Sequence, residues 1–207
     1  MIQFFKILSL TSVIFFLAQT TADAENPQDQ LEATVDDVVR ILYDRDAPLT
    51  LRQERLQAAL QERFSFAVIS QRSMGRNWQS LDESERERFT ELFTELLIQS
   101  YTSGLEGEAL GQKPAIEWQG RRELRKGLIE IQSEVTLDKQ TFPIRYRMAR
   151  LNEGWRVYDI VVEGVSLVGN YRKQFTSILQ RGSPDDLFKT LEEKVARNRV
   201  DPGSQVQ

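Results

Sequence analysis

Apolar residues recur at helical spacing through the first half of the chain. The first stripe consists of Leu31, Val35, Val38, Val39 and Leu42. This spacing is typical of one face of an amphipathic helix, which Asp46-Ala47-Pro48 would end. A second helix is expected to be capped by Thr50, and a short third helix runs to Met74, with Gly75 as its stop.

The longest predicted helix follows Ser80-Leu81-Asp82-Glu83, which has the form of a capping box. Its apolar face contains Phe89, Leu92, Phe93, Leu96, Leu97 and Tyr101. Charged residues occupy the opposite face, and Gly104 and Gly107 are expected to end the helix. The pattern predicts a helix that buries an aromatic face.

The period of the apolar residues changes to two in the second half of the chain. Ile116 and Trp118 indicate a first strand, and three longer strands follow over residues 129–137, 142–148 and 155–162. The short turns between these strands predict an antiparallel meander.

The alternation also predicts how the second and third strands pair. If Lys139-Gln140 is a two-residue loop, Val135 lies opposite Ile144 and Glu134 lies opposite Arg145. Apolar side chains then meet on the inner face, and an acid meets a base on the outer face.

The turn before the last long strand leaves two alternatives. A three-residue loop that ends at Gly154 places Asp159 opposite Arg147, with Tyr158, Ile160 and Val162 facing inward. A two-residue loop would invert the strand. The first alternative is preferred because it pairs the acid with a base.

The segment from Gly154 to Phe175 reads as a covered strand that runs directly into a helix. Gly164 breaks the strand, and Ser166 is a candidate N-cap of the helix. A last helix begins at Ser183-Pro184-Asp185-Asp186, and residues 201–207 form a polar tail.

Composition limits the possible chemistry. The 207 residues include no cysteine and no histidine, which excludes disulfides, thiol nucleophiles and the commonest general base and metal ligand. The formal net charge is −4, which does not suggest bulk binding of nucleic acid. We therefore expect neither a cofactor nor a metal.

The N-terminus has the pattern of a secretory signal peptide. Lys6 supplies a positive charge, residues 7–17 are apolar, and Ala22-Asp23-Ala24 has the form of a cleavage site. The apolar run is shorter than the roughly 20 residues that span a bilayer. Residues 1–24 are therefore expected to be removed, the alternative being an uncleaved anchor.

Two blocks of the sequence resemble the MlaC family, the toluene-tolerance auxiliary proteins of ABC-type lipid transport. One is WRVYDIVVEGVSLVGNYRKQF, ending at Phe175. The other combines FSF at Phe64, MGRNW at Met74 and FTELFTELLIQSY at Phe89. The order and spacing match, and the resemblance spans roughly Leu31 to Leu191.

The resemblance and the sequence pattern together imply a single α+β domain over residues 25–200. We expect a curved antiparallel sheet of about four strands, with helices covering its concave face, in a cone related to the nuclear-transport-factor fold. The aromatic face of the longest helix, with Phe89 and Phe93, is expected to face the inner side of this sheet. The resemblance further implies an apolar cavity and a soluble periplasmic carrier of phospholipid. Its partners would be an inner-membrane ABC lipid-transport complex and an outer-membrane lipoprotein and porin complex, and its role would be to maintain lipid asymmetry.

The resemblance and the apolar faces suggest which residues would contact lipid. Those expected at the tails are Phe66, Met74, Phe89, Phe93, Leu97, Tyr101, Ile131, Val135, Ile144, Tyr146, Met148, Ile160, Val165 and Tyr171. Those expected at the head group or at a partner surface are Arg72, Arg76, Arg172 and Lys173. Periodicity cannot distinguish the wall of a cavity from a packed core, and only the resemblance favours the cavity.

Two other classes of function stay open at this stage. An enzyme on the same fold would need an acid–base set, for which the candidates are Asp159, Glu163, Tyr146 and Tyr158. A non-lipid adaptor of a transport complex would have a packed core and an exposed apolar patch. Mass spectrometry of the purified protein would detect bound phospholipid only for the carrier.

The signal pattern makes a testable prediction about processing. The mature protein should begin near Glu25, because the apolar run is too short to serve as a stable anchor. N-terminal sequencing of the protein from an envelope fraction checks this, and a sequence starting at Met1 would contradict it.

Overall fold

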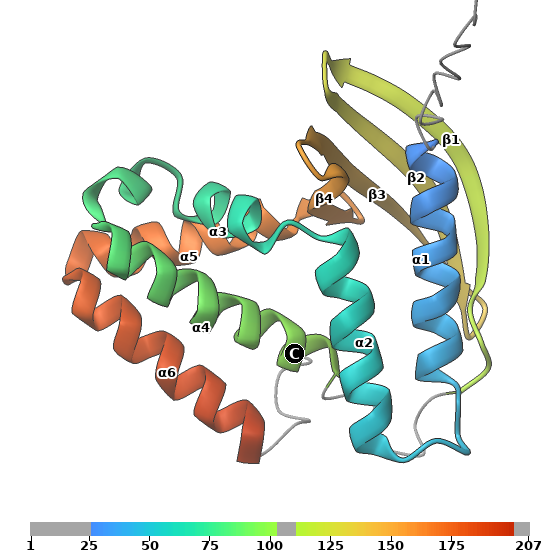
Figure 1. The fold of residues 1–207 in the computed structure, drawn as a ribbon, viewed down its shortest axis with the longest axis horizontal. Coiled ribbons are helices and arrows are strands. Elements are labelled where there is room, and N and C mark those ends of the chain that lie inside the picture. The colour runs from blue at the N-terminus through green and yellow to red at the C-terminus, as the bar shows by residue number, and fades with distance from the viewer. Residues whose placement is uncertain (1–25, 103–110, 201–207) are drawn as a thin grey trace, which may run out of the picture.

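The predicted strands form one curved sheet, and the helices pack on it in two groups (Figure 1). The computed structural model describes residues 26–102 and 111–200. The first two helices, α1 (Pro27–Leu42) and α2 (Leu49–Arg63), form a hairpin beside the sheet, and the later helices form a separate layer (Figure 1). The fold is therefore a single α+β domain with a curved antiparallel sheet, as predicted, and this sheet is open.

The described residues contain six α-helices and one short 3₁₀ helix. The helices are α1 (Pro27–Leu42), α2 (Leu49–Arg63), α3 (Phe66–Met74), η1 (Gly75–Ser80), α4 (Glu83–Thr102), α5 (Leu167–Arg181) and α6 (Pro184–Val200). In these parts of the chain, no helix is both long enough and apolar enough to cross a membrane.

The sheet is a meander in which each strand pairs with the next one in the chain. Its strands are β1 (Ala115–Arg125), β2 (Leu128–Leu137), β3 (Gln140–Leu151), β4 (Gly154–Val162) and β5 (Val165–Ser166), in that order. The four long strands confirm the predicted meander. The two-residue strand β5 adds a fifth that the apolar pattern did not indicate.

The pairing of β2 with β3 differs from the prediction by two residues. Leu137 pairs with Gln140, so the loop is Asp138-Lys139, and both residues have positive φ, of 49° and 69°. Aspartate tolerates this conformation better than glutamine does, which favours this loop over Lys139-Gln140. The predicted pairs Glu134–Arg145 and Val135–Ile144 are therefore wrong, although the inner and outer faces are assigned correctly.

The pairing of β3 with β4 puts Asp159 opposite Arg147, as predicted, but by a different route. The loop has two residues, since Leu151 pairs with Gly154. Met148 pairs with Val157 but Arg147 pairs with Asp159, so Tyr158 is an extra residue of β4 in a β-bulge. This extra residue returns Asp159 to the face of the sheet that was predicted for it. Ile160 lies opposite Tyr146 on the inner face. The inward placement of Tyr158 is wrong, because the bulge turns this side chain to the outer face, where it meets Arg72.

The helix ends confirm some predicted caps and correct others. Ser166 caps α5 by accepting a hydrogen bond from the amide of Gly169, as predicted. The capping box of α4 uses Asp82 and Glu85 rather than Ser80 and Glu83. Pro48 occupies the N-cap position of α2, so Thr50 lies inside that helix. The predicted stops at Gly104 and Gly107 lie outside the described residues.

Two large apolar clusters divide the molecule. One joins α3, α4, α5 and α6 around Phe89 and Phe93, and both of these rings are fully buried. The other joins the inner face of the sheet to α1 through Leu31, with Ile131 and Met148 from the strands. The expectation that α4 covers the sheet is therefore wrong, because α1 takes that place and the aromatic face of α4 packs against other helices (Figure 1).

The turn between β4 and β5 depends on the conformation of Gly164. Its φ is +87°, and no atom lies within 4 Å of the position a Cβ would occupy. Gly164→Ala should therefore lower the free energy of unfolding by about 1 kcal/mol through backbone strain alone. Gly111→Ala is the control, since Gly111 does not have a positive φ. Urea denaturation measures both, and equal stability of the two variants would contradict the prediction.

Candidate functional site

An apolar cavity lies between the α1–α2 hairpin, the start of α3, the end of α4 and the inner face of β3 and β4. Its volume is about 300 Å³. The residues that line it are Leu31, Thr34, Val35, Val38, Leu42, Leu56, Leu60, Phe64, Phe66, Ile69, Leu97, Ile98, Tyr146, Ile160 and Leu167. None of these lining residues carries a charge.

The packing of the hairpin explains why a cavity is present here. The N-terminal half of α1 packs on the sheet through Leu31. Its C-terminal half packs on α2, where Ile41 meets Leu56. Because α1 and α2 contact different partners along their lengths, the space between the hairpin, the sheet and α4 is not filled by side chains.

The cavity wall includes two polar side chains, those of Thr34 and Tyr146, and neither is charged. The Thr34 hydroxyl donates to the carbonyl oxygen of Gln30 at 2.9 Å and accepts from Nε of Arg63 at 3.1 Å. Burial raises the pKa of the Tyr146 phenol, which therefore stays neutral at physiological pH. The wall consequently presents hydrocarbon and aromatic surface to an occupant.

The structure places only some of the predicted tail-contacting residues at this wall. Four of them line the cavity: Phe66, Leu97, Tyr146 and Ile160. Met74, Phe89, Phe93 and Tyr171 instead belong to the cluster of α3 to α6. The sequence pattern showed that these residues are apolar and on one face, but it could not show which element covers that face.

The remaining predicted residues lie on the sheet or at its edge. Ile131 and Met148 are fully buried under α1, and Ile144 packs beside them. Val135 is half-buried, whereas Val165 is 63% exposed in the β4–β5 turn. Tyr101 belongs to α4, but its side chain lies outside the part of the structure that is described.

Most of the wall comes from residues that sequence reasoning did not assign to it. Seven of these eleven residues lie on α1 and α2, such as Val35, Val38 and Leu60, and the other four are Phe64, Ile69, Ile98 and Leu167. The helical stripe of α1 was visible in the sequence, and an amphipathic helix near the N-terminus could have been considered as a cover for the sheet. Nothing local to α1 indicates that the sheet curves around it.

The four predicted cations do not line the cavity. Arg72 and Arg172 meet at the opposite, outer face of β4, where the carbonyl oxygen of Arg72 accepts a hydrogen bond from Nε of Arg172 at 2.8 Å. Arg76 and Lys173 are exposed on η1 and α5. A head-group role for Arg76 and Lys173 stays a prediction.

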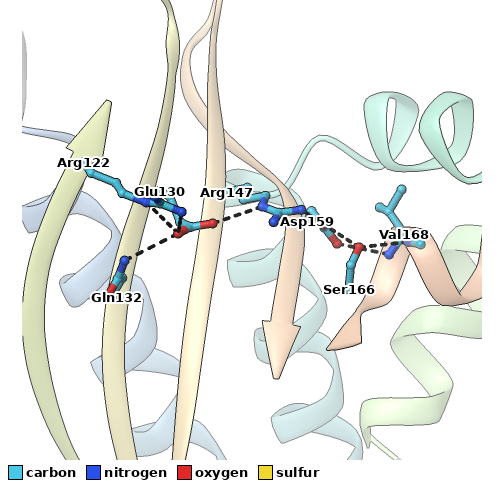
Figure 2. Close-up of polar contacts among 8 residues, drawn as sticks. Arg122, Glu130, Gln132, Arg147, Asp159, Ser166 and Val168 are labelled. Carbon is cyan, nitrogen blue, oxygen red and sulfur yellow. Dashed lines mark hydrogen bonds and ion pairs between the residues drawn. The ribbon is translucent and has the colours of Figure 1, made fainter. Parts of the chain in front are cut away.

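A row of alternating charges crosses the outer face of the sheet (Figure 2). Arg122, Glu130, Arg147 and Asp159 are directly opposed neighbours on β1, β2, β3 and β4. Glu130 is fully buried and accepts hydrogen bonds from Arg122 at 2.8 Å and from Arg147 at 3.1 Å. Burial by itself raises the pKa of Glu130, but the hydrogen bonds and charges of these arginines hold it below its ordinary value.

Asp159 extends this row to the N-terminus of α5 (Figure 2). Its carboxylate accepts hydrogen bonds from Arg147 at 3.0 Å, from the Ser166 hydroxyl at 2.7 Å and from the amide of Val168 at 3.0 Å. The same carboxylate therefore neutralises part of a guanidinium and caps a helix.

The residues considered for acid–base chemistry do not come together. Asp159 and Tyr158 lie on the outer face of the sheet, and Tyr146 lies at the cavity on the inner face. Glu163 occupies the exposed β4–β5 turn with a φ of 49°. These four side chains therefore do not form one site.

Comparison with known proteins relates the chain to a family of lipid-binding proteins. The family model described as MlaC protein matches residues 32–193. The "intermembrane phospholipid transport system binding protein MlaC" of Haemophilus influenzae is 21% identical over 204 residues, which cover 94% of each chain. A solved phospholipid-binding protein of Ralstonia solanacearum, in complex with a phospholipid, has a TM-score of 0.74 and 25% identity, covering 84% of this chain and 99% of that one.

The charged row predicts a pH-dependent contribution of Glu130 to stability. Glu130→Gln leaves Arg147 without a charged partner on one side, so we expect the free energy of unfolding at pH 7 to fall by about 3 kcal/mol. The folded-state pKa of Glu130 is depressed. Its contribution is therefore fully present above the unfolded pKa of about 4.3 and is lost as the pH falls through the depressed folded pKa. The gap between the two proteins should therefore be constant from pH 7 to about pH 5 and should narrow progressively below about pH 4.

Glu134→Gln is the matched control for this experiment. Glu134 is an exposed carboxylate on the same strand and the same face of the sheet. Its variant should differ from the wild type by less than about 0.5 kcal/mol at every pH. Denaturant titration between pH 3 and pH 7 measures all three proteins. A gap between wild type and Glu130→Gln that does not change with pH would contradict the assignment.

Proposed function

The chain belongs to the MlaC family of phospholipid-binding transport proteins, and we propose that it carries phospholipid between the outer membrane and an inner-membrane ABC transporter. The observation that supports this most directly is the uncharged cavity between the α1–α2 hairpin and the sheet. An apolar wall of this kind suits acyl chains, which need no hydrogen-bond partners. The related protein solved with a phospholipid supports the same ligand class.

The energetics of a carrier require only that its cavity resemble the interior of a bilayer. Moving two acyl chains of about 30 methylenes out of water is worth about 24 kcal/mol, beyond any usual non-covalent affinity. The lipid, however, comes from a membrane in which its tails are already dry. The exchange between membrane and carrier is therefore close to neutral, and both uptake and release are possible.

The size of the cavity sets a structural requirement on binding. A volume of about 300 Å³ accommodates about 10 water-sized groups. Two acyl chains are larger than this, so a whole phospholipid requires the cavity to widen. The α1–α2 hairpin is the element to move, because it forms one complete wall and packs on the sheet through few side chains, chiefly Leu31 and Val35.

The cavity does not indicate the direction of transport or the partners, and we infer both from the proposed role as a carrier. A carrier with near-neutral exchange cannot set a direction, so direction must come from the complexes that it meets. We propose an ATP-driven complex at the inner membrane and a lipoprotein and porin complex at the outer membrane, with maintenance of lipid asymmetry as the outcome. This role requires a periplasmic protein, which agrees with the signal pattern of residues 1–24.

Filling the cavity tests the proposal without adding a charge to the protein. Val38 lines the cavity from α1, and Val38→Trp should occupy part of the volume that lipid tails need. We expect at least a tenfold loss of co-purifying phospholipid, with a melting temperature close to that of the wild type, because an apolar ring enters an existing space. Mass spectrometry of the extracted lipid and thermal unfolding measure the two effects.

Val39→Trp is the control, because Val39 is the next residue of α1 and does not line the cavity. It should retain the phospholipid load of the wild type. If Val38→Trp does not fold, Ile160→Trp tests the same cavity from β4. A folded variant at either position that keeps its full lipid load would refute tail binding in this cavity.

A further inference from the structure

A second pocket lies on the outer face of the sheet, away from the apolar cavity. Its volume is about 370 Å³. Tyr146 and Ile160 line the cavity, whereas the neighbouring residues Arg147 and Asp159 line this pocket. Because successive side chains of a strand point to opposite faces, β3 and β4 separate the two spaces.

The lining of this outer pocket carries an excess of positive charge. Its charged residues are Arg72, Arg122, Arg147, Arg172, Glu130 and Asp159. Four guanidinium groups less two carboxylates give a formal charge of +2. Both carboxylates are already engaged by Arg122 and Arg147, which leaves the charges of the two other arginines uncompensated.

Arg72 is held in place by an aromatic ring and not by an acid. Its guanidinium lies over the ring of Tyr158, with 4.1 Å between the guanidinium carbon and the ring centre. In the described parts of the chain, no carboxylate forms an ion pair with Arg72. A contact with a ring face restrains the guanidinium without using its N–H groups, which stay available for an anion.

Arg172 reaches the same pocket from α5. Its Nε donates to the carbonyl oxygen of Arg72 at 2.8 Å, and its aliphatic chain crosses Gly75, where a Cβ would lie 3.2 Å from the arginine Cδ. Across residues 26–102 and 111–200, Arg172 also lacks a carboxylate partner. Two arginines from the neighbouring helices α3 and α5 thus line one pocket without a carboxylate partner among the described residues.

We propose that the outer pocket binds a phosphate group, held chiefly by Arg72 and Arg172. A phosphate has oxygens in several directions and can accept hydrogen bonds from two guanidinium groups in different planes. A single carboxylate is planar, carries one charge and is satisfied by one guanidinium fork, so it would leave part of the +2 charge uncompensated. The site is separate from the tail cavity and does not depend on the proposed function.

Titration with inorganic phosphate tests the site directly. Isothermal titration calorimetry in a low-salt chloride buffer should detect binding to the full-length mature protein. The double variant Arg72→Gln/Arg172→Gln should weaken this binding at least tenfold, because each arginine supplies charge-assisted hydrogen bonds. Arg172→Gln by itself, at an exposed position, should weaken it measurably and covers the case in which the double variant does not fold.

Arg181→Gln is the matched control. Arg181 is an exposed arginine at the other end of α5, so its variant changes the net charge of the same helix without touching the pocket. It should bind phosphate as the wild type does. Equal weakening in Arg181→Gln, or no phosphate binding by the wild type, would overturn the proposal.

Two further arms identify the source of the phosphate and separate this site from the cavity. Vesicles of phosphatidylcholine containing phosphatidic acid should bind the wild type better than the double variant if the group belongs to a membrane lipid. Phosphate binding without this vesicle effect supports a soluble phosphate. Binding of an acidic peptide in place of phosphate would overturn the proposal, as would loss of the co-purifying phospholipid in the double variant.

Discussion

The carboxylate of Asp159 connects the sheet to the helical layer, and the placement of α5 on the sheet depends on this connection. It accepts hydrogen bonds from Arg147 of β3, from Ser166 at the end of β5 and from the first turn of α5. The two-residue turn Glu163-Gly164 joins β4 to β5, and α5 follows β5 directly. The direction in which α5 leaves the sheet is therefore set by a buried ionic contact and a turn that needs positive φ.

The direction of α5 in turn determines which apolar faces of the helices and the sheet pack against each other. Phe175 of α5 packs edge-on against Phe89 and Phe93 of α4, which places the aromatic face of α4 among helices and away from the sheet. The concave face of the sheet is then covered by α1, which the chain supplies from its N-terminal end. The filled core lies among α3 to α6, whereas the cavity lies mainly between the α1–α2 hairpin and the sheet, so the molecule contains both.

The two faces of the sheet consequently have different chemistry. The inner face contributes Tyr146 and Ile160 to the apolar cavity. The outer face carries the row from Arg122 to Asp159, in which each acid lies beside an arginine. Alternation along β3 and β4 keeps the charges out of the cavity, so a carrier can expose hydrocarbon on one side and guanidinium groups on the other.

The sequence by itself determined the long helices, the meander of the four long strands and the facing of β2 and β3, because these depend on the local periods of apolar residues and on the residues of the short turns. It also identified the family blocks and four cavity residues, including Phe66 and Ile160. It did not determine the β2–β3 register, the bulge before Tyr158 or the role of α1. An amphipathic pattern in the sequence shows only that one face of a helix or strand is buried, and not which element covers it. The curvature of the sheet and the contact of Asp159 with α5 decided which buried faces pack together, because both bring together residues that are distant in the chain.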